Sequence, residues 1–438
     1  MSTPQEQVSE QSDAQQKLEL LLNISQALGE EFQLDRMLIT MVSEVTRAMR
    51  AERTSLFLYD EPAKQLYTKV AEGMNAVEIR VPLGIGIVGM TAEARRPINI
   101  PDAYQDSRFN QAFDKKSGFV TRSILSVPII SQQNRLLGVV QVLNKRGGVF
   151  TDDDQNFLRA ICTHLALALQ RAELVDSYVQ TQKLQQYLKL AHEIQMGMVP
   201  RDFPAFPDKP EVDIHAVLDP ALDVGGDLYD YFLLDENRLC FIIGDVSDKG
   251  IPAALFMAIT RTAFKISAMG NSGLVATTLE LVNKFLCAGN DSQMFVTVFC
   301  GILDLRTGRV EYSDGGHEPP FIIRHKTGVE FVDKKGGMAL GFMDGIPFPT
   351  GYLQLNPGDT LVLYTDGVNE ALDNDSQLFH VNRMDTTLRR YVDGVPASTI
   401  VRALVDDVAA FVGSAPQSDD LTIVTLRYLG PRTEPLTA

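Results

Sequence analysis

The sequence predicts an α+β protein with two folded domains joined by a long polar helix. The chain has 438 residues, which at roughly 100–200 residues per domain is enough for two or three domains with cores of their own. Strand-like and helical stretches form two separate blocks, each with strands before and after a helical stretch. Between the blocks, residues 151–196 contain neither Gly nor Pro, which is typical of one continuous helix.

The composition excludes several classes of protein. Hydrophobic residues make up 45% and charged residues 22% of the chain, so wholesale disorder is excluded. Forty Lys and Arg against 56 Asp and Glu give a net charge of −16, which argues against nucleic acid or an anionic membrane as the main partner. The polar N-terminus shows no secretory pattern, and no apolar run approaches the roughly 20 residues that a membrane helix needs. We therefore expect no membrane partner.

The cysteines indicate the compartment. They are few, scattered and set in apolar surroundings, so they are expected to be small core residues rather than a disulfide framework or zinc ligands: Cys162, Cys240, Cys287 and Cys300. Free buried thiols are typical of a reducing compartment. We expect a cytoplasmic protein.

The first block predicts one antiparallel sheet with flanking helices. Residues 1–14 are polar and are expected to form a loose tail. A helical period begins at Lys17, breaks near Gly29 and resumes at Met37. A helix from Asp152 closes the block. The strand-like stretches between are RTSLFLYD, QLYTKVA, VEIRVP, SILSVPII and LLGVVQVLNK.

The closing helix is predicted to continue to about Met198. Leu174, Thr181 and Leu188 lie seven residues apart, and Leu184 and Ala191 take the intervening positions of this seam. The seam is impure, because Ser177 and Gln195 also fall on it. Such a seam is typical of a coiled coil. We favour a parallel homodimer formed through residues 173–200, because so polar a helix is poorly stable alone. The alternative is a single amphipathic helix lying on a neighbouring domain.

The second block begins after a cluster of prolines at residues 200–210. Residues 235–237 are predicted to turn one strand into the next as a hairpin. Helices are expected at 252–267, 274–286 and 399–412. The strand-like stretches are VDIHAVLDP, LYDYFLL, RLCFIIGDV, FVTVFCGILDL, VEYSDG, PFIIRH, GVEFV, DTLVLYTDG and LTIVTLRY. Strands on both sides of a helical pair predict stacked sheets covered by helices.

Four segments of this block place aspartates where a strand ends or turns: DVGGDLYD, GDVSDKG, YTDGVNE and SDDLT. The strands CFIIGD and LVLYTD are apolar up to the aspartate, so each carboxylate is expected at the rim of a buried sheet. Charge there must be paired, hydrogen-bonded or bound to metal. We find no comparable set of Lys or Arg at these strand ends. A turn explains any one segment alone, but four together favour a magnesium or manganese site.

Residues 201–430, which contain these acidic segments, resemble the metal-dependent PPM-type serine/threonine phosphatases. Within that family they resemble the SpoIIE/RsbU-like branch. The resemblance rests on EIQMGMVP before the domain, followed by DVGGDLYD, GDVSDKGIPAALFMA, MFVTVFCGILD, GGHEPP, LVLYTDGVNEA and SDDLTIVTL in the order of the family. It implies an αββα sandwich with two Mn²⁺ or Mg²⁺ ions in a cleft at its edge.

The resemblance also implies a role for each acid. Asp245 would bridge both metal ions, and the carbonyl of Val246 would add a ligand. Asp227 would serve one ion directly or through water. Asp366 and Asp419 would hold the other ion.

The remaining acids of these motifs are assigned differently. Asp420 stands where the family often has Asn, so we interpret it as a metal-site group that acts through water or behind the ligands. Asp223, Asp230 and Glu370 are expected to be structural or solvated.

The implied chemistry is hydrolysis without a protein nucleophile. Two cations lower the pKa of a water molecule between them and neutralise phosphoryl oxygens, so that hydroxide attacks phosphorus in line. His317 is the one plausible histidine for a general acid, with a turn-stabilising role as the alternative. Animal-type members of the wider family bind the phosphate with an arginine, and no arginine before Asp227 matches it. The metal ions alone, a partner or Lys249 would then bind the phosphate.

Residues 15–172 resemble a GAF domain in ERTSLFLYD, VPLGIGIVGMTAEARRPINIPDAYQDSRFN, RSILSVPI and LLGVVQVLNK. This implies a sensor for an unidentified small-molecule or protein signal. The glycine string at residues 84–89 is interpreted as a turn opening a short helix rather than a dinucleotide site. Four positions match the pattern of cyclic-nucleotide-binding GAF domains, while Gln155 replaces its final Glu: Asn144, Lys145, Phe150 and Asp154. We expect these residues to brace the fold, with a cyclic nucleotide as the less favoured alternative.

Together these patterns predict a GAF sensor at 15–172, a helical coiled-coil linker at 173–200, a phosphatase domain at 201–430 and a tail at 431–438. The expected substrate is phosphoserine or phosphothreonine on a partner protein. The resemblance implies that this partner is a STAS-type anti-anti-sigma factor of a partner-switching pathway. The alternatives are a catalytically weak, ligand-gated scaffold that binds a phosphorylated partner, and a metal-dependent hydrolase of small phosphates such as nucleotides.

Overall fold

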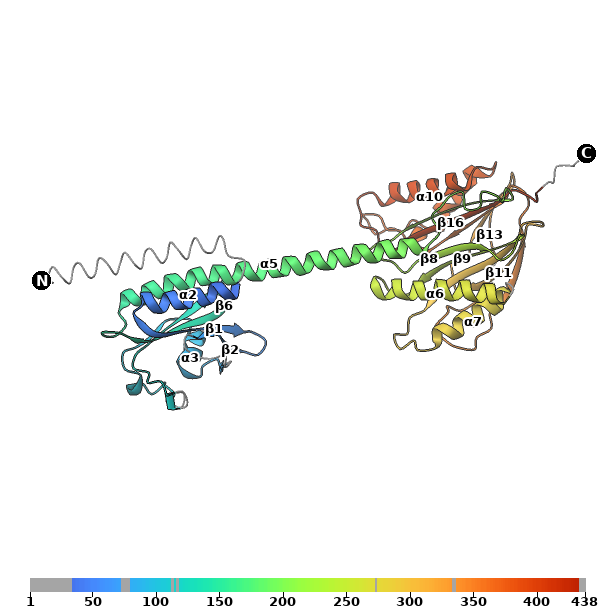
Figure 1. Ribbon diagram of the computed structural model, residues 1–438. Coiled ribbons are helices and arrows are strands. Elements are labelled where there is room, and N and C mark those ends of the chain that lie inside the picture. Colours follow the sequence, from blue (N-terminus) through green and yellow to red (C-terminus); the bar gives the residue numbers. More distant parts are fainter. Residues whose placement is uncertain are drawn as a thin grey trace, which may run out of the picture. The chain divides into compact units, whose positions relative to one another are not determined.

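A computed structural model describes residues 34–71, 79–111, 114–115, 118–271, 274–332 and 336–432. The chain divides into two compact units, Met1–Gln182 and Lys183–Ala438. Figure 1 labels the helices and strands of both units. The helical segment predicted from Lys17 to Gly29 lies outside the described residues.

The first unit is built on a six-stranded antiparallel sheet in the order β3-β2-β1-β6-β5-β4. The prediction of a single antiparallel sheet is confirmed. Its strands are β1 (Ala51–Asp60), β2 (Gln65–Ala71), β3 (Arg80–Pro82), β4 (Ile98–Ile100), β5 (Ile124–Ile130) and β6 (Leu136–Lys145). A one-turn helix, η1 (Ala103–Gln105), follows β4.

Helices cover both faces of this sheet (Figure 1). Helix α2 (Leu34–Ala48) and the first turns of α5 (Asp152–Met198) bury their apolar sides with Leu56, Val140 and their neighbours. Helix α3 (Gly86–Ala94) packs on the other face with Phe57 and Val139. Because side chains alternate along a strand, adjacent residues such as Leu56 and Phe57 serve the two different cores.

Helix α5 runs without a break for 47 residues, as the absence of Gly and Pro predicts. Three acidic residues in its first turn complement the positive end of the helix dipole. Its first turns contribute Leu158 and Ile161 to the core of the first unit, and its last turn contributes Met196 to the core of the second. On the seam between, Leu174 and Leu184 are exposed. The coiled-coil dimer stays a prediction.

The second unit contains two stacked five-stranded sheets, in the orders β14-β11-β10-β9-β8 and β13-β12-β15-β16-β7. Between them lies a core rich in aromatic side chains, including Phe241, Phe299 and Tyr312. The strands are β7 (Val212–Asp219), β8 (Leu228–Leu233), β9 (Arg238–Val246), β10 (Val296–Asp304), β11 (Arg309–Gly315), β12 (Phe321–Arg324), β13 (Gly328–Phe331), β14 (Thr350–Gln354), β15 (Thr360–Tyr364) and β16 (Leu421–Tyr428).

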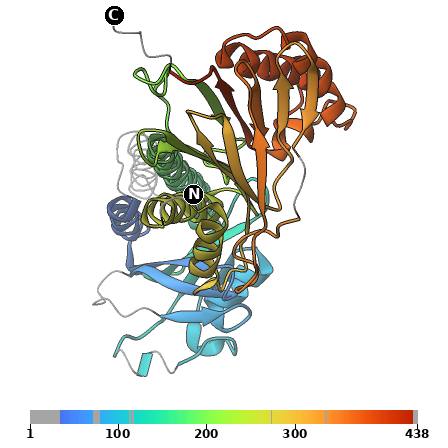
Figure 2. The same cartoon turned by 90° about the vertical axis from the view of Figure 1, so that its right-hand side faces the viewer.

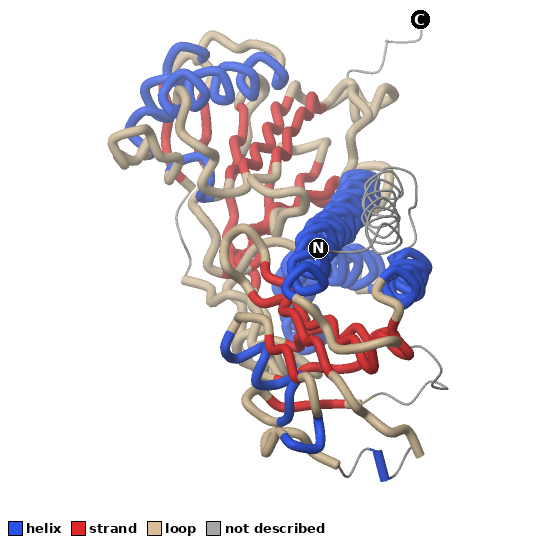
Figure 3. Tube along the Cα trace, turned by 90° about the vertical axis from the view of Figure 1, so that its left-hand side faces the viewer, coloured by secondary structure: helices blue, strands red, loops and turns tan. Residues whose placement is uncertain are grey.

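Helices form the outer layers of this sandwich. Helices α6 (Ile251–Gly270) and α7 (Val275–Cys287) cover the sheet that contains β9. Helices α9 (Val381–Leu388) and α10 (Ala397–Val412) cover the sheet that contains β16. Figures 1 and 2 show this order of helix, sheet, sheet and helix, and Figure 3 shows the helices in blue outside the strands in red. The predicted αββα sandwich is confirmed.

The sequence analysis found no apolar run near the length of a membrane helix, and one helix of the described residues is an exception by that measure. Helix α6 has 20 residues and is apolar enough, by length and composition alone, to cross a membrane. Its apolar side packs on the sheet through Met257 and Phe264, and its Arg261 forms an ion pair with the buried Asp230 of β8. These contacts are those of a helix that covers a sheet.

Candidate active site

The predicted acidic segments meet at one edge of the sandwich, where strands of both sheets end. In the first sheet, Leu228 pairs with Gly244, which places the neighbouring Asp227 and Asp245 side by side. In the second, β15 ends just before Asp366 and pairs with β16, which starts just after Asp420. Strand ends from positions far apart in the sequence therefore bring these acids together.

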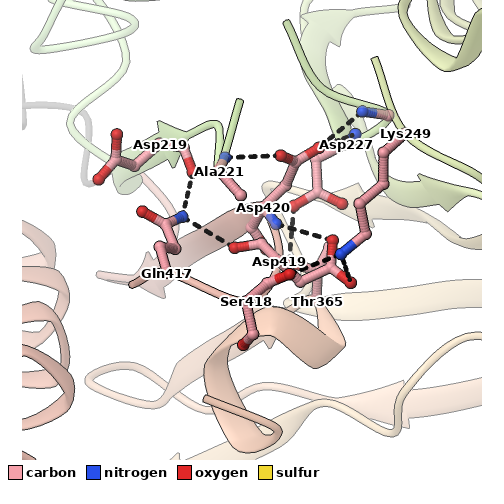
Figure 4. Close-up of polar contacts among 10 residues, drawn as sticks. Asp219, Ala221, Asp227, Lys249, Thr365, Gln417, Ser418, Asp419 and Asp420 are labelled. Atoms are coloured by element: carbon pink, nitrogen blue, oxygen red, sulfur yellow. Dashed lines mark hydrogen bonds and ion pairs between the residues drawn. The ribbon is translucent and has the colours of Figure 1, made fainter. Parts of the chain in front are cut away.

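One hydroxyl group joins the two sheets at this edge. Thr365 lies between β15 and Asp366, and its Oγ1 donates to Asp227 Oδ2 at 2.8 Å. The same oxygen accepts from the backbone N–H of Thr422 on β16 at 3.0 Å. Figure 4 shows Thr365 below Asp227 and beside Asp419 and Asp420. Thr365 thus fixes Asp227 of one sheet against the strand ends of the other.

Burial and mutual repulsion disfavour the ionised form of three of these acids. Burial, followed by the charges of Asp245 and Asp420, raises the pKa of Asp227 well above its usual range. Burial, followed by the charges of Asp366, Asp419 and Asp420, raises the pKa of Asp245 to about 8. The pKa of Asp366 rises to about 6, through burial and then Asp419. Buried carboxylates that face one another are the arrangement that a divalent cation stabilises.

Basic residues reach this region at two points, although the strand ends themselves carry no comparable set of Lys or Arg. Lys249 Nζ lies 2.8 Å from Asp419 Oδ2 and donates to the carbonyl of Ser418 at 2.6 Å (Figure 4). Arg261 Nη2 lies 2.8 Å from Asp230 Oδ2, which makes Asp230 structural, as expected. In the described part of the chain, no ion pair reaches Asp227, Asp245 or Asp366.

Asp420 holds the backbone of a loop. Its Oδ1 accepts from the N–H of Ala221 at 2.8 Å, and its Oδ2 accepts from the N–H of Gly226 at 2.6 Å. Both oxygens are thus engaged with residues 221–227, which lead into β8; we call this stretch the 221–227 loop. The sequence predicted a supporting role for Asp420 but not which groups it supports.

Glycines allow this loop to approach the site closely. A Cβ atom on Gly225 would lie 2.1 Å from Asp420 Oδ2, and one on Gly226 would lie 2.9 Å from the carbonyl oxygen of Val246. No side chain fits at either position without movement of its neighbours. The Val246 carbonyl, predicted as a metal ligand, therefore lies directly against the loop that carries Asp227.

His317 joins β10, where Thr297 pairs with Asp245 of β9, to β15, which leads to Asp366. It is buried. Its Nε2 lies 3.1 Å from the carbonyl oxygen of Tyr364, and its Nδ1 lies 2.9 Å from Thr297 Oγ1. A carbonyl oxygen only accepts, so Nε2 carries the proton and Nδ1 accepts from Thr297. Of the two roles predicted for His317, this geometry supports the structural one.

Comparison with known families agrees with this fold. Residues 235–429 match the family described as Stage II sporulation protein E (SpoIIE), and residues 33–169 match the GAF domain. The chain joins a GAF domain to a SpoIIE-type PPM phosphatase domain. The SiaA-PP2C domain of Pseudomonas aeruginosa has the same fold, with a TM-score of 0.51 and 22% identity, over 57% of this chain and 98% of that one.

Curated relatives resemble parts of the chain. Protein IcfG of Synechocystis sp. is 29% identical over 265 residues, which are 55% of this chain and 41% of IcfG. The dual 3',5'-cyclic-AMP and -GMP phosphodiesterase 11A of Takifugu rubripes is 34% identical over 169 residues, which are 36% of this chain and 19% of that protein. The chain thus spans less than half the length of these relatives.

The acids of the phosphatase domain fit divalent cations in their chemistry. They offer carboxylate oxygens, which Mg²⁺ and Mn²⁺ prefer, and Asp227 and Asp245 face other carboxylates rather than basic groups. Among the residues that the structure describes, no three His, Cys, Asp or Glu side chains are yet arranged as the ligands of one ion. One predicted ligand, Asp419, is paired with Lys249.

In the GAF domain, the residues of the nucleotide-type pattern brace the fold. Asn144 Oδ1 accepts from the N–H of Arg122 at 2.6 Å, and its Nδ2 donates to the carbonyl of Val120 at 2.7 Å. Asp154 forms an ion pair with Lys145 and accepts from the N–H of Thr151. These bonds tie β6 to its neighbours and to the start of α5, and they require no ligand.

Proposed function

We propose that this chain is a signal-regulated protein phosphatase that hydrolyses phosphoserine or phosphothreonine on a partner protein. The observation that carries the proposal is the convergence of Asp227, Asp245 and Asp366 from the ends of strands in both sheets, without a basic partner among the described residues. The match to the SpoIIE family supports the phosphatase chemistry, and the GAF domain supports regulation by a signal.

Two divalent cations, Mn²⁺ or Mg²⁺, would be held by these acids. Asp245 would contact both ions, with Asp227 and the Val246 carbonyl beside it, and Asp366 and Asp419 would complete the second site. Bound there, the ions would lower the pKa of a water molecule and neutralise charge on the phosphoryl oxygens. Asp420 would stay with the 221–227 loop, because both of its oxygens already accept backbone N–H groups.

The residues of the chain have three further tasks in this proposal. Thr365 orients Asp227 through the bond to its Oδ2. His317 links β10, which pairs with β9 beside Asp245, to β15, which leads to Asp366. Lys249, which pairs with Asp419, would give up this carboxylate to a bound cation, and its ammonium group could then attract a phosphoryl oxygen.

The partner and the cellular setting follow from the SpoIIE/RsbU-like resemblance. We infer a phosphorylated STAS-type anti-anti-sigma factor as the substrate, in the cytoplasm, with the chain acting as a homodimer through residues 173–200. Exposure of Leu174 and Leu184 on α5 supports such a pairing, because both lie on the seven-residue seam.

A phosphate-release assay on the full-length protein tests the function. A phosphoseryl protein of the STAS type, p-nitrophenyl phosphate and a nucleoside triphosphate would be compared in Mn²⁺ and in EDTA. We expect Mn²⁺-dependent release that is fastest from the phosphoprotein. Binding of the phosphoprotein without turnover of any substrate would favour the scaffold, and preference for the nucleotide would favour a hydrolase of small phosphates.

A further inference from the structure

The C-terminal end of α5 forms hydrogen bonds with the 221–227 loop. Gln195 is 5% exposed; its Nε2 donates to the carbonyl of Gly225 at 2.6 Å, and its Oε1 accepts from the N–H of Gly225 at 3.1 Å. One turn earlier, His192 Nδ1 lies 2.8 Å from the carbonyl oxygen of Asp223. Gln195 therefore satisfies both backbone groups of one residue, as a neighbouring β-strand would.

The opposite side of the loop rests on Asp420. The N–H groups of Ala221 and Gly226 donate to its carboxylate, and the close approach at Gly225 leaves no room for a side chain there. Gly225 thus lies between Gln195 and Asp420, two residues before Asp227. Two side chains therefore hold the loop that carries Asp227: Asp420 and, from α5, Gln195.

Gln195 occupies a position where an apolar residue would be expected. It interrupts the seven-residue seam of α5, and its neighbour Met196 is part of the core between the sheets. Burial of an amide is unfavourable unless each polar atom finds a partner, and both atoms of Gln195 find theirs on Gly225. Its bonds to the 221–227 loop, and not contacts within α5, therefore explain why a polar residue stands at position 195.

We propose that Gln195 is a positioning residue of the phosphatase site, which preorganises Asp227 for cation binding by fixing the 221–227 loop. This inference rests on the proposed function. Groups that orient metal ligands from behind typically change metal affinity 10- to 100-fold when they are removed. Both bonds to Gly225 come from the single side chain of Gln195, so a rotation of the last turn of α5 would break them together. Helix α5 is uninterrupted from Asp152 to this turn.

The test compares two buried amides in the full-length protein. Gln195→Met keeps the length of the side chain and removes both hydrogen bonds. Asn283→Leu is the matched control, because Asn283 on α7 is 1% exposed, donates to the carbonyl of Met343 and accepts from the N–H of Gly341. Both variants should lose thermal stability, since each leaves buried backbone groups without partners.

The deciding measurements are Mn²⁺ affinity by titration calorimetry and amide exchange. We expect Gln195→Met to weaken Mn²⁺ binding about tenfold, and Asn283→Leu to keep the wild-type affinity. In EDTA, the amides of Ala221 and Gly226 should exchange faster in Gln195→Met by about tenfold. These two amides donate to Asp420 and not to Gln195, so a purely local role would leave their exchange unchanged.

The outcomes separate this inference from the proposed function. Wild-type Mn²⁺ affinity and wild-type exchange in Gln195→Met would overturn the positioning role, as would equal weakening of Mn²⁺ binding in Asn283→Leu. A wild-type protein that binds no Mn²⁺ would contradict the proposed function instead. In that case the rate of amide exchange at Gly226 in Gln195→Met would still decide whether Gln195 fixes the loop.

Discussion

Buried aspartates have opposite surroundings in the two domains. In the GAF domain, Asp154 is 1% exposed and is satisfied by Lys145 and by the N–H of Thr151. In the phosphatase domain, Asp227 is equally buried, yet its neighbours are threonine hydroxyl groups and other carboxylates. The same residue type at the same burial is thus stable in one place and electrostatically strained in the other.

The difference shows that burial alone does not identify a functional acid. Asp154 and the paired Asp230 are structural because a cation of the chain itself neutralises each of them. Asp227 and Asp245 have no such cation among the described residues, and burial together with neighbouring carboxylates raises the pKa of both. The partner set is therefore the feature that points to a site for an external cation.

The largest expected effect separates the two classes of acid. Asp245→Asn should lower phosphatase activity by on the order of 10³-fold, because several kcal/mol of transition-state stabilisation depend on the cations that it would hold. The midpoint of thermal unfolding in EDTA should stay the same or rise, because one repelling carboxylate is gone. Asp235→Asn, in the turn before the same strand, is the control and should keep full activity. Equal activity of Asp245→Asn and wild type would contradict the site.

The matching substitution in the GAF domain should have the reverse effect. Asp154→Asn removes the charge that pairs with Lys145, and we expect it to lower the free energy of unfolding by about 2 kcal/mol, as for a hydrogen bond to a charged group. The Mn²⁺ affinity of the phosphatase domain should not change. Denaturant unfolding followed by circular dichroism, with calorimetry of Mn²⁺ binding, measures both quantities. An unchanged stability would show that Asp154 is not structural.

A smaller effect is expected for the histidine that joins the sheets. His317→Gln keeps one polar group but cannot reach both Thr297 and Tyr364, so about 1 kcal/mol of stability should be lost. The pH dependence of kcat should keep its shape, because both ring nitrogens of His317 are already engaged. Loss of one limb of the pH profile would instead identify His317 as a general acid.

The architecture and most site residues could be predicted because each left a local signal. Apolar strands that end in aspartate predicted where Asp245 and Asp366 would lie, and the absence of Gly and Pro predicted α5. Strand β14 gave no such signal, because it has little apolar alternation and contains Gly351. That glycine is needed there, since a Cβ atom would lie 2.3 Å from the Tyr312 ring.

Roles that depend on long-range contacts could not be predicted. Asp420 holds a backbone N–H that is 194 residues away in the sequence, and Lys249 reaches Asp419 across 170 positions through a turn in which Asp248 has a φ of 67°. Gln195 did leave a signal, as a polar residue on an apolar seam. The sequence could show that exception but not which group it binds.

The smallest expected effect is that of Lys249, the basic residue that pairs with the predicted metal ligand Asp419. Lys249→Met would free Asp419, and since exposed ion pairs contribute about 0.5–1 kcal/mol, Mn²⁺ should bind roughly two- to fivefold more tightly. Calorimetry with Lys284→Met on α7 as the control measures this. Weaker Mn²⁺ binding in Lys249→Met would mean that the lysine orients Asp419 for the metal ion rather than competing with it. Asp419 would then resemble the satisfied acids of the GAF domain more than Asp227 does.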